Sequence, residues 1–229
     1  MNLSNETVSV LKNFASINQN LVIKAGDNIS TMSAMKNIVA SAEVKETFPT
    51  EFAIYDLNEF LASVSLFEKP SLDFKDDFVV MTNDGSTSKA LKYWYSDPSV
   101  VTTVTKEITM PECEVSFSLE NDLLSNVQKA AAVIGVPDMA LEAMDSGVAL
   151  LKVTDKKNAT ANDYAVKVDV NNDDGKNLPY KFWFKVENLK LLPGKYDVGV
   201  SSKNISHFVN INVGIEYWIA LEPESKYGA

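Results

Sequence analysis

The chain contains 229 residues, with 21 basic residues, all of them lysine, against 31 acidic residues, so that its formal net charge is −10. Hydrophobic residues make up 45% and charged residues 23%, which excludes a disordered chain and allows one large domain or two smaller ones. The single cysteine and single histidine exclude an intrachain disulfide and cysteine-built or multi-histidine metal sites. An acidic chain without arginine also lacks the basic patch that is typical of DNA-binding proteins.

The first half of the chain predicts two helices with strands between and after them. Ser4 is a good N-cap, Glu6 suits the first turn, and apolar residues follow at Val8, Leu11 and Phe14. Asp56 begins a second helix over residues 57–67. The segments with strand character are 21–24, 38–44, 52–55, 72–74, 78–82 and 90–95.

Residues 96–111 form an irregular stretch that opens with Asp97-Pro98, and we interpret it as a connector. Ser118 then predicts the cap of a helix over 119–134, and a short helix is expected at 187–192, ended by Pro193-Gly194. The expected strands of this half are 139–144, 148–153, 164–170, 180–186, 196–201, 208–213 and 217–221, with a turn at 171–177.

The second half repeats the order of elements of the first half. The repetition is clearest where a strand leads into a helix, as a comparison of residues 52–58 with residues 182–188 shows. We therefore predict an α+β protein of two similar domains, residues 1–108, which include most of the connector, and residues 109–229.

The polar faces of the two longer helices carry no acid beyond their first turns, although acids outnumber lysines in the chain. One explanation is chance together with the preference of acids for first turns, and the other is a surface that avoids repelling phosphate. Lysine suits loose phosphate contact, whereas reading of base edges favours arginine. The residues on these two faces are Asn5, Ser9, Lys12, Asn13 and Ser16 in the first helix, and Asn121, Ser125, Gln128, Lys129 and Ala132 in the third.

Several segments, in order along nearly the whole chain, resemble the DNA polymerase sliding clamps of T-even-type bacteriophages. They are Leu3-Ser4, Leu11-Lys12-Asn13-Phe14-Ala15, Phe52-Ala53-Ile54-Tyr55-Asp56-Leu57-Asn58, Ser96-Asp97-Pro98-Ser99, Lys190 with Pro193-Gly194 and Tyr196, and Tyr217-Trp218-Ile219-Ala220-Leu221-Glu222. The resemblance is weakest between residues 139 and 177.

The resemblance implies a DNA clamp fold in which each domain has two inner helices and outer antiparallel sheets, assembled as a homotrimeric ring around duplex DNA. It also implies the phage DNA polymerase and an ATP-driven clamp loader as partners, with late-transcription factors as further partners. The expected location is the cytoplasm of the infected bacterial host. No cofactor, metal or catalytic residue is implied.

The resemblance also indicates which residues carry the function. Family members place basic residues on the inner helices, and the positions that match in this sequence are Lys12, Lys129 and Lys190, with Lys24 and Lys185 as further candidates. Partners of the family dock short peptides in an apolar pocket, for which the candidates near the connector and the last strand are Val101, Ile108, Met110, Trp218 and Ile219. Each of these apolar residues also suits a place in the core.

Other functions find little support in the sequence. Residues 169–175 hint at a calcium loop, but the glycine is one place late and position twelve is Tyr180, so a solvated turn is favoured. No nucleotide-binding or hydrolase motif occurs, which leaves a hydrolase using Asp56 or Asp97 with little basis. A phage structural or interaction protein built from β-rich domains is the main alternative. No secretory signal and no transmembrane segment are predicted.

Overall fold

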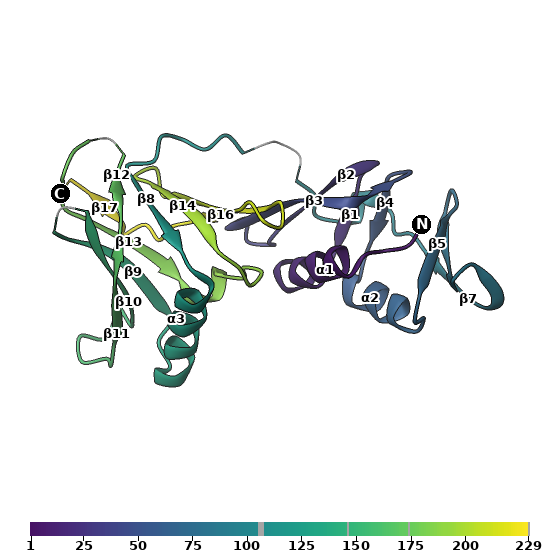
Figure 1. Cartoon of the computed structure of the whole chain (residues 1–229), viewed down its shortest axis with the longest axis horizontal. Coiled ribbons are helices and arrows are strands. Elements are labelled where there is room, and N and C mark those ends of the chain that lie inside the picture. Colours follow the sequence, from purple (N-terminus) through teal and green to yellow (C-terminus); the bar gives the residue numbers. More distant parts are fainter. Residues whose placement is uncertain (105–107, 146, 174, 229) are drawn as a thin grey trace. The chain divides into compact units, whose positions relative to one another are not determined.

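The computed structural model describes residues 1–104, 108–145, 147–173 and 175–228. The chain divides into two compact units, whose elements are labelled in Figure 1. Unit 1 contains Met1–Glu107 with Val213–Ile215, and unit 2 contains Ile108–Asn212 with Glu216–Ala229. Residues 105–107 of the predicted connector and Asp174 of the predicted turn lie outside the described residues.

Unit 1 combines two α-helices with antiparallel strands. The helices α1 (Asn5–Ile17) and α2 (Leu57–Ser65) lie side by side (Figure 1). The short strand β1 pairs with β4, β2 pairs with β3, and a separate three-stranded sheet has the order β5-β6-β7. The strands are β1 (Leu21–Ile23), β2 (Gly26–Met32), β3 (Ile38–Phe48), β4 (Phe52–Ile54), β5 (Pro70–Phe74), β6 (Phe78–Asn83) and β7 (Ser86–Trp94), followed by a 3₁₀ turn, η1 (Pro98–Val100).

Both helices of unit 1 begin at the residues that the sequence predicts. The Ser4 hydroxyl accepts a hydrogen bond from the backbone N–H of Thr7 at 3.2 Å. The Asp56 carboxylate accepts from the N–H groups of Asn58 and Glu59, at 2.9 and 3.1 Å. These contacts satisfy donors that have no partner inside a helix, which is why each helix begins there.

Strand β3 provides a second cap for α1 that the sequence does not reveal. The carboxylate of Glu46 accepts hydrogen bonds from the Ser4 N–H and the Thr7 hydroxyl. Partial burial raises the pKa of Glu46, but the hydrogen bonds from Thr7 and Ser4 outweigh it, and the net effect lowers the pKa below its ordinary value of 4.5. The ionised carboxylate therefore stabilises the junction of α1 and β3.

Unit 2 is richer in strands and has one α-helix within its described residues, α3 (Asn121–Ile134). One sheet has the order β11-β10-β9-β13-β17, and β12, β8, β14, β15 and β16 follow one another in a second. The strands are β8 (Val115–Leu119), β9 (Asp138–Asp145), β10 (Val148–Thr154), β11 (Tyr164–Asp169), β12 (Asn171–Asn172), β13 (Tyr180–Lys185), β14 (Tyr196–Ser201), β15 (Ile205–Asn210), β16 (Ile215–Ala220) and β17 (Lys226–Tyr227).

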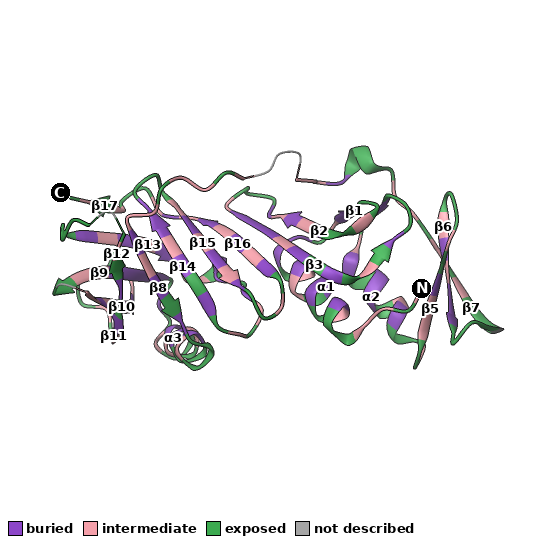
Figure 2. Ribbon diagram, turned by 45° about the horizontal axis from the view of Figure 1, so that its top comes forward, coloured by how far each residue is buried: buried purple, intermediate pink, exposed green. Residues whose placement is uncertain are grey.

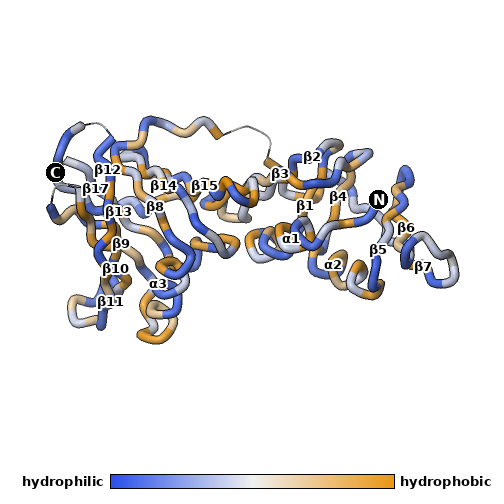
Figure 3. Tube along the Cα trace, in the orientation of Figure 1, coloured by the Kyte–Doolittle hydropathy of each residue, from blue (hydrophilic) through white to orange (hydrophobic). Residues whose placement is uncertain are grey.

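The core of unit 2 follows the period-two pattern of its strands. Buried and half-buried residues alternate along β15 and β16 (Figure 2), and β10 carries a hydrophobic stretch (Figure 3). Aromatic rings fill the centre: Phe208 lies edge-on to Phe184 and to Tyr196, and Tyr196 lies edge-on to Tyr217.

The predicted second helix of this half, residues 187–192, is wrong. Only a 3₁₀ turn, η2 (Val186–Asn188), forms, and the chain then runs in irregular conformation to Pro193. The Leu192 N–H donates to the Tyr217 hydroxyl at 3.0 Å, and Leu192 O accepts from the Tyr196 hydroxyl at 2.5 Å. These side-chain partners, together with the following proline, favour an irregular segment over a helix of six residues.

The predicted start of α3 is also wrong. Ser118 belongs to β8, where its hydroxyl donates to Asp197 at 3.1 Å, and the helix begins at Asn121 after Glu120, whose side chain makes no capping hydrogen bond. Strands β2, β8, β12 and β17 are absent from the sequence prediction, which places β12 in a turn. Strand β2 opens with Gly-Asp-Asn, residues of low strand propensity, although Ile29 and Thr31 further along it are buried.

Replacing the strand-borne cap is expected to destabilise unit 1. We predict that Glu46→Gln lowers the free energy of unfolding near neutral pH by about 1 to 2 kcal/mol, since charge-assisted hydrogen bonds are weakened. The difference from wild type is full above pH 4.5 and disappears as the pH falls through the lowered pKa, because the wild-type carboxylate is then protonated.

Urea unfolding of both proteins as a function of pH measures this effect. Glu43→Gln, which removes an exposed carboxylate from the same strand, is the matched control and should change stability little. A Glu46→Gln protein that is as stable as the control at neutral pH would contradict the capping role.

Candidate nucleic-acid interface

The exposed faces of α1 and α3 carry one lysine each and no acid beyond the first turn, and α3 also exposes the apolar side chains of Ala132 and Val133. Lys12 and Lys129 are exposed, and the acids of these helices, Glu6 and Asp122, lie in the first turns. Glu6 is further neutralised by Lys45, whose ammonium lies 3.1 Å from its carboxylate. The hydrogen bond from its own backbone N–H is the largest cause of the lowered pKa of Glu6, and the hydrogen bonds from Lys45 and Ser4 lower this pKa further.

The remaining lysine candidates differ in their surroundings. Lys24 is exposed just after β1, and Lys190 is exposed in the irregular segment after η2. Lys185, at the end of β13, is half-buried, and its ammonium lies 2.5 Å from the carboxylate of Asp138, a residue that is only 1% exposed. The backbone N–H of Lys156 donates to the second oxygen of Asp138 at 3.0 Å.

Lys185 is thus engaged in a structural ion pair, and we remove it from the candidates for nucleic-acid contact. A buried carboxylate without a cation is strongly unfavourable, so Lys185 compensates Asp138 in the folded protein. The sequence does not show this, because Asp138 precedes Lys185 by 47 residues and only the pairing of β9 with β13 brings them together.

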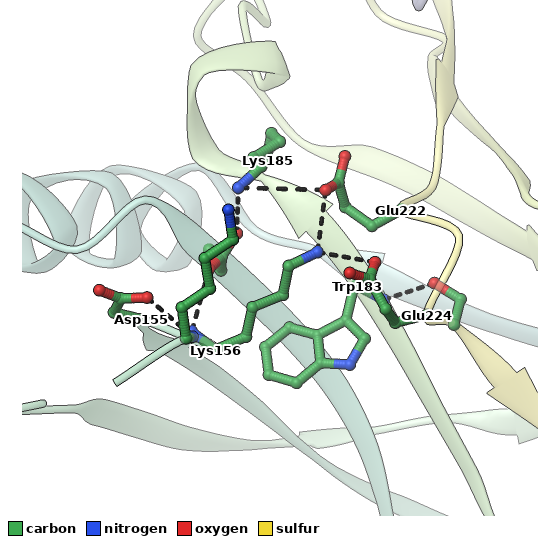
Figure 4. Close-up of polar contacts among 9 residues, drawn as sticks. Asp155, Lys156, Trp183, Lys185, Glu222 and Glu224 are labelled. Atoms are coloured by element: carbon green, nitrogen blue, oxygen red, sulfur yellow. Dashed lines mark hydrogen bonds and ion pairs between the residues drawn. The ribbon is translucent and has the colours of Figure 1, made fainter. Parts of the chain in front are cut away.

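Lys185 belongs to a larger charged cluster, shown in Figure 4. The ammonium of Lys156 lies 2.9 Å from Glu222 and 2.8 Å from Glu224 and is 9% exposed, and Lys185 lies 4.0 Å from Glu222. Burial alone would lower the pKa of Lys156, but the hydrogen bonds to Glu224 and Glu222 outweigh it and raise the pKa. The cluster holds the segment after β16 against the sheet that contains β13.

The apolar candidates for a partner pocket divide into buried and accessible residues. Val101 packs with Val22 and Ala53 in the core of unit 1, and Ile219 is 0% exposed in β16, so neither side chain offers surface. Ile108, Met110 and Trp218 are half-buried and all belong to unit 2. These three remain candidates.

Trp218 lies beside a depression on the β8-β14-β15 part of the sheet. Its ring stacks on His207, with centroids 4.8 Å apart and planes inclined by 9°, and His207 Nε2 lies 2.7 Å from the carboxylate of Glu216. The depression has a volume of about 280 Å³, and Ser116, Gly199 and His207 are among its lining residues. His207 therefore has a packing and hydrogen-bonding role.

Gly199 allows the end of the connector to approach this sheet closely. A Cβ added at Gly199 would lie 2.7 Å from the sulfur of Cys113. Burial, together with the carboxylates of Asp173 and Glu114, raises the pKa of the Cys113 thiol, which disfavours its thiolate.

Within the described residues the structure contains no candidate metal centre and no candidate membrane-spanning helix. Among the described residues, no group of three or more His, Cys, Asp or Glu side chains is placed to hold a metal ion. No helix in the described part of the chain is long and apolar enough to cross a membrane.

Comparison with solved structures defines the class of fold. The chain is similar to the proliferating cellular nuclear antigen of Entamoeba histolytica, with a TM-score of 0.69 and 14% identity over 96% of this chain and 97% of that chain. It is also similar to a chain of the PCNA2–PCNA3 complex of Sulfolobus tokodaii, with a TM-score of 0.72 and 10% identity over 98% of this chain and 100% of that chain. The predicted α+β clamp fold is confirmed.

Comparison of sequences identifies the family. The profile described as "DNA polymerase processivity factor" matches residues 4–102, and the profile described as "gp45 sliding clamp, C terminal" matches residues 116–223. The sliding clamp of Vibrio phage KVP40 is 34% identical over 226 residues, covering 97% of this chain and 99% of that protein. The sliding clamps of Escherichia phage RB69 and Enterobacteria phage T4 are 26% and 24% identical, each covering 99% of both chains. The chain belongs to the phage sliding clamps, the processivity factors of DNA polymerase.

A charge substitution separates the structural lysine from the exposed one. We predict that Lys185→Met lowers the free energy of unfolding by about 2 to 3 kcal/mol, because it leaves Asp138 buried without its cation. Lys129→Met, on the exposed face of α3, should change stability by less than about 0.5 kcal/mol. Chemical denaturation measures both, and equal stability of the two variants would contradict the structural role of Lys185.

Proposed function

We propose that this clamp forms a homotrimeric ring around duplex DNA and tethers the phage DNA polymerase, with residues 1–108 and 109–229 as its two clamp domains. The observation that best supports DNA as the enclosed partner is the character of the exposed faces of α1 and α3. Each presents one lysine among uncharged side chains, in a chain of net charge −10. Such a face contacts phosphates without reading bases.

The mechanism of the proposed ring is topological, and no residue has a catalytic role in it. A closed ring stays on DNA without a tight interface, while lysine–phosphate contacts exchange as it slides. The inner contacts are assigned to Lys12 and Lys129, with Lys190 and Lys24 as further candidates. Holding the polymerase near the primer end raises its effective concentration there, and this is the source of processivity.

Two unpaired strand edges suit the closure of such a ring. Strand β7 ends the β5-β6-β7 sheet of unit 1, and β11 ends the β11-β10-β9-β13-β17 sheet of unit 2. Each edge carries an exposed aromatic side chain, Trp94 at 61% and Tyr164 at 39%. Strand β7 contributes Lys89 and Lys92 and no acid, whereas β11 contains Lys167 and Asp169 and is preceded by Asp163, which pairs with Lys152. Pairing of β7 in one copy with β11 in the next is heterologous and closes by rotation.

The partners proposed for the ring are those of a replication clamp. Short peptides of the polymerase, of an ATP-driven clamp loader and of late-transcription factors would bind the surface formed by Ile108, Met110 and Trp218, beside the depression at His207. The exposed edge of a half-buried tryptophan and a neighbouring depression suit an apolar peptide anchor. The expected compartment is the cytoplasm of the infected bacterium.

Loading onto circular DNA tests the enclosed-ring mechanism. With its cognate loader and ATP, the protein should be retained on nicked circular DNA and lost when the circle is linearised, because only a topological link depends on free ends. Lys12→Glu combined with Lys129→Glu should reduce loading about tenfold or more, since two phosphate contacts per subunit become repulsive. Equal retention on circles and linear DNA would refute the mechanism.

A charged residue on the β7 edge tests the proposed subunit contact. We predict that Trp94→Asp shifts the protein from trimer to monomer in light scattering at micromolar concentration, because the carboxylate would be desolvated in the contact. Met35→Asp, which replaces another exposed apolar side chain in the β2–β3 turn, is the control and should remain trimeric. Identical masses for the two variants would exclude β7 from the interface.

A further inference from the structure

The two sheets that offer β7 and β11 each have a second edge, and in both cases a terminal segment of the same chain covers it. In unit 1 the Met1 amine donates to Leu72 O at 2.7 Å, and the Leu72 N–H donates to Met1 O at 2.7 Å. Asn2 forms a β-bridge with Ser71. The segment therefore pairs with β5, the strand opposite β7 in that sheet.

In unit 2 the segment 222–228 covers the edge of β13. Strand β17 supplies the pairs Tyr180 with Tyr227 and Lys181 with Lys226. Beyond these two pairs, the same segment also satisfies the backbone groups of Trp183. The Trp183 N–H donates to the Ser225 hydroxyl at 2.8 Å, and Trp183 O accepts from the Glu222 N–H at 2.8 Å. The backbone groups that β13 presents here are thus satisfied along most of its length.

Three kinds of contact hold this segment in place. Lys156 binds Glu222 and Glu224, as Figure 4 shows. The ring of Tyr227 stacks with those of Tyr180 and Phe182, each at a centroid distance of 6.3 Å. The Gly228 N–H donates to Pro179 O at 2.8 Å.

Strand β13 is a strand that needs such cover. Its sequence, Tyr-Lys-Phe-Trp-Phe-Lys, contains four aromatic residues of high strand propensity, and carboxylates pair with both of its lysines, Lys181 and Lys185. Segments of high strand propensity and low net charge pair readily with other chains when their edge is open. Natural proteins protect edges of this kind with short strands, loops or charges. The open edges, β7 and β11, carry exposed polar and charged residues over much of their length.

We infer that the terminal segments are edge guards that determine which strands join copies of this chain: they close β5 and β13 and leave β7 and β11 for assembly. This inference rests on the proposed ring for the role of β7 and β11. The blocking of β13 stands on the contacts of unit 2 alone. Side-chain contacts hold the guard of β13 in addition to its backbone ladder, so substitution of those side chains weakens the guard without altering the strand that it covers.

The test uses the full-length chain with the guard released by Lys156→Met, Ser225→Ala and Tyr227→Ser. The control makes the same three kinds of substitution at surface positions away from the guard. They are Lys195→Met, Ser65→Ala and Tyr55→Ser. Both sets are made alone and together with Trp94→Asp, which removes the proposed ring contact. Light scattering over a range of concentrations gives the mass, and hydrogen exchange gives the protection of the Trp183 amide.

With Trp94→Asp present, the released-guard protein should associate with increasing concentration, whereas the control should stay monomeric. The Trp183 amide should exchange about tenfold faster or more in the released-guard protein, because its acceptor on Ser225 is gone. A released-guard protein that keeps the mass and the Trp183 protection of the control would overturn the inference.

The readouts also distinguish the two proposals. If Trp94→Asp leaves the mass of the assembly unchanged, the proposed ring contact at β7 is wrong. The effect of releasing the guard is then measured by hydrogen exchange at the Trp183 amide and by a mass larger than that of the control protein. If circular dichroism shows that the released-guard protein is unfolded, the single variant Ser225→Ala is used to test the inference. It preserves every backbone group and should still accelerate exchange at Trp183, and unchanged exchange overturns the inference.

Discussion

The backbone of a sheet edge must find partners, and this requirement organises both units of the clamp. An unpaired edge presents N–H and C=O groups that either remain in water, are covered by the same chain, or pair with another chain. In this protein two sheets each have one edge that a segment of the same chain covers and one edge that remains in water. Two hydrogen bonds between Met1 and Leu72, and the hydrogen bond from the Trp183 N–H to Ser225, contribute to that difference.

The lysines of the chain have two kinds of surroundings. Several lysines of unit 2 form ion pairs with carboxylates, as Lys185 does with Asp138 and Lys156 does with Glu222. The exposed faces of α1 and α3 retain lysine without neighbouring acids along the helix. A net charge of −10 is therefore compatible with a surface that tolerates phosphate, because the charges that matter are local.

The sequence permits prediction of those elements whose causes are local. The starts of α1 and α2 follow from Ser4 and Asp56, and most strands in each half follow from apolar alternation and turn residues. The false helix at 187–192 has a non-local cause, since Tyr196 and Tyr217 hold Leu192 in an irregular segment. Local propensity has no access to such partners.

The site shows the same division between local and distant causes. The faces carrying Lys12 and Lys129 can be found from helical periodicity alone, because every residue of the face lies in one segment. The role of Lys185 cannot be found in this way, because Asp138 reaches it only through the pairing of β9 with β13. Lys156 and its partners, 66 and 68 residues away, were missed for the same reason.

The absence of arginine on α1 and α3 has a consequence for how the proposed ring travels. An ammonium group has no preferred plane and donates to any phosphate oxygen that comes within reach, whereas a guanidinium favours one bidentate orientation. With lysine alone, the interaction energy varies little from one base step to the next, so translation along the duplex meets low friction. The ring would then move along the duplex without following the helical groove, and its rate of sliding would depend little on the base sequence.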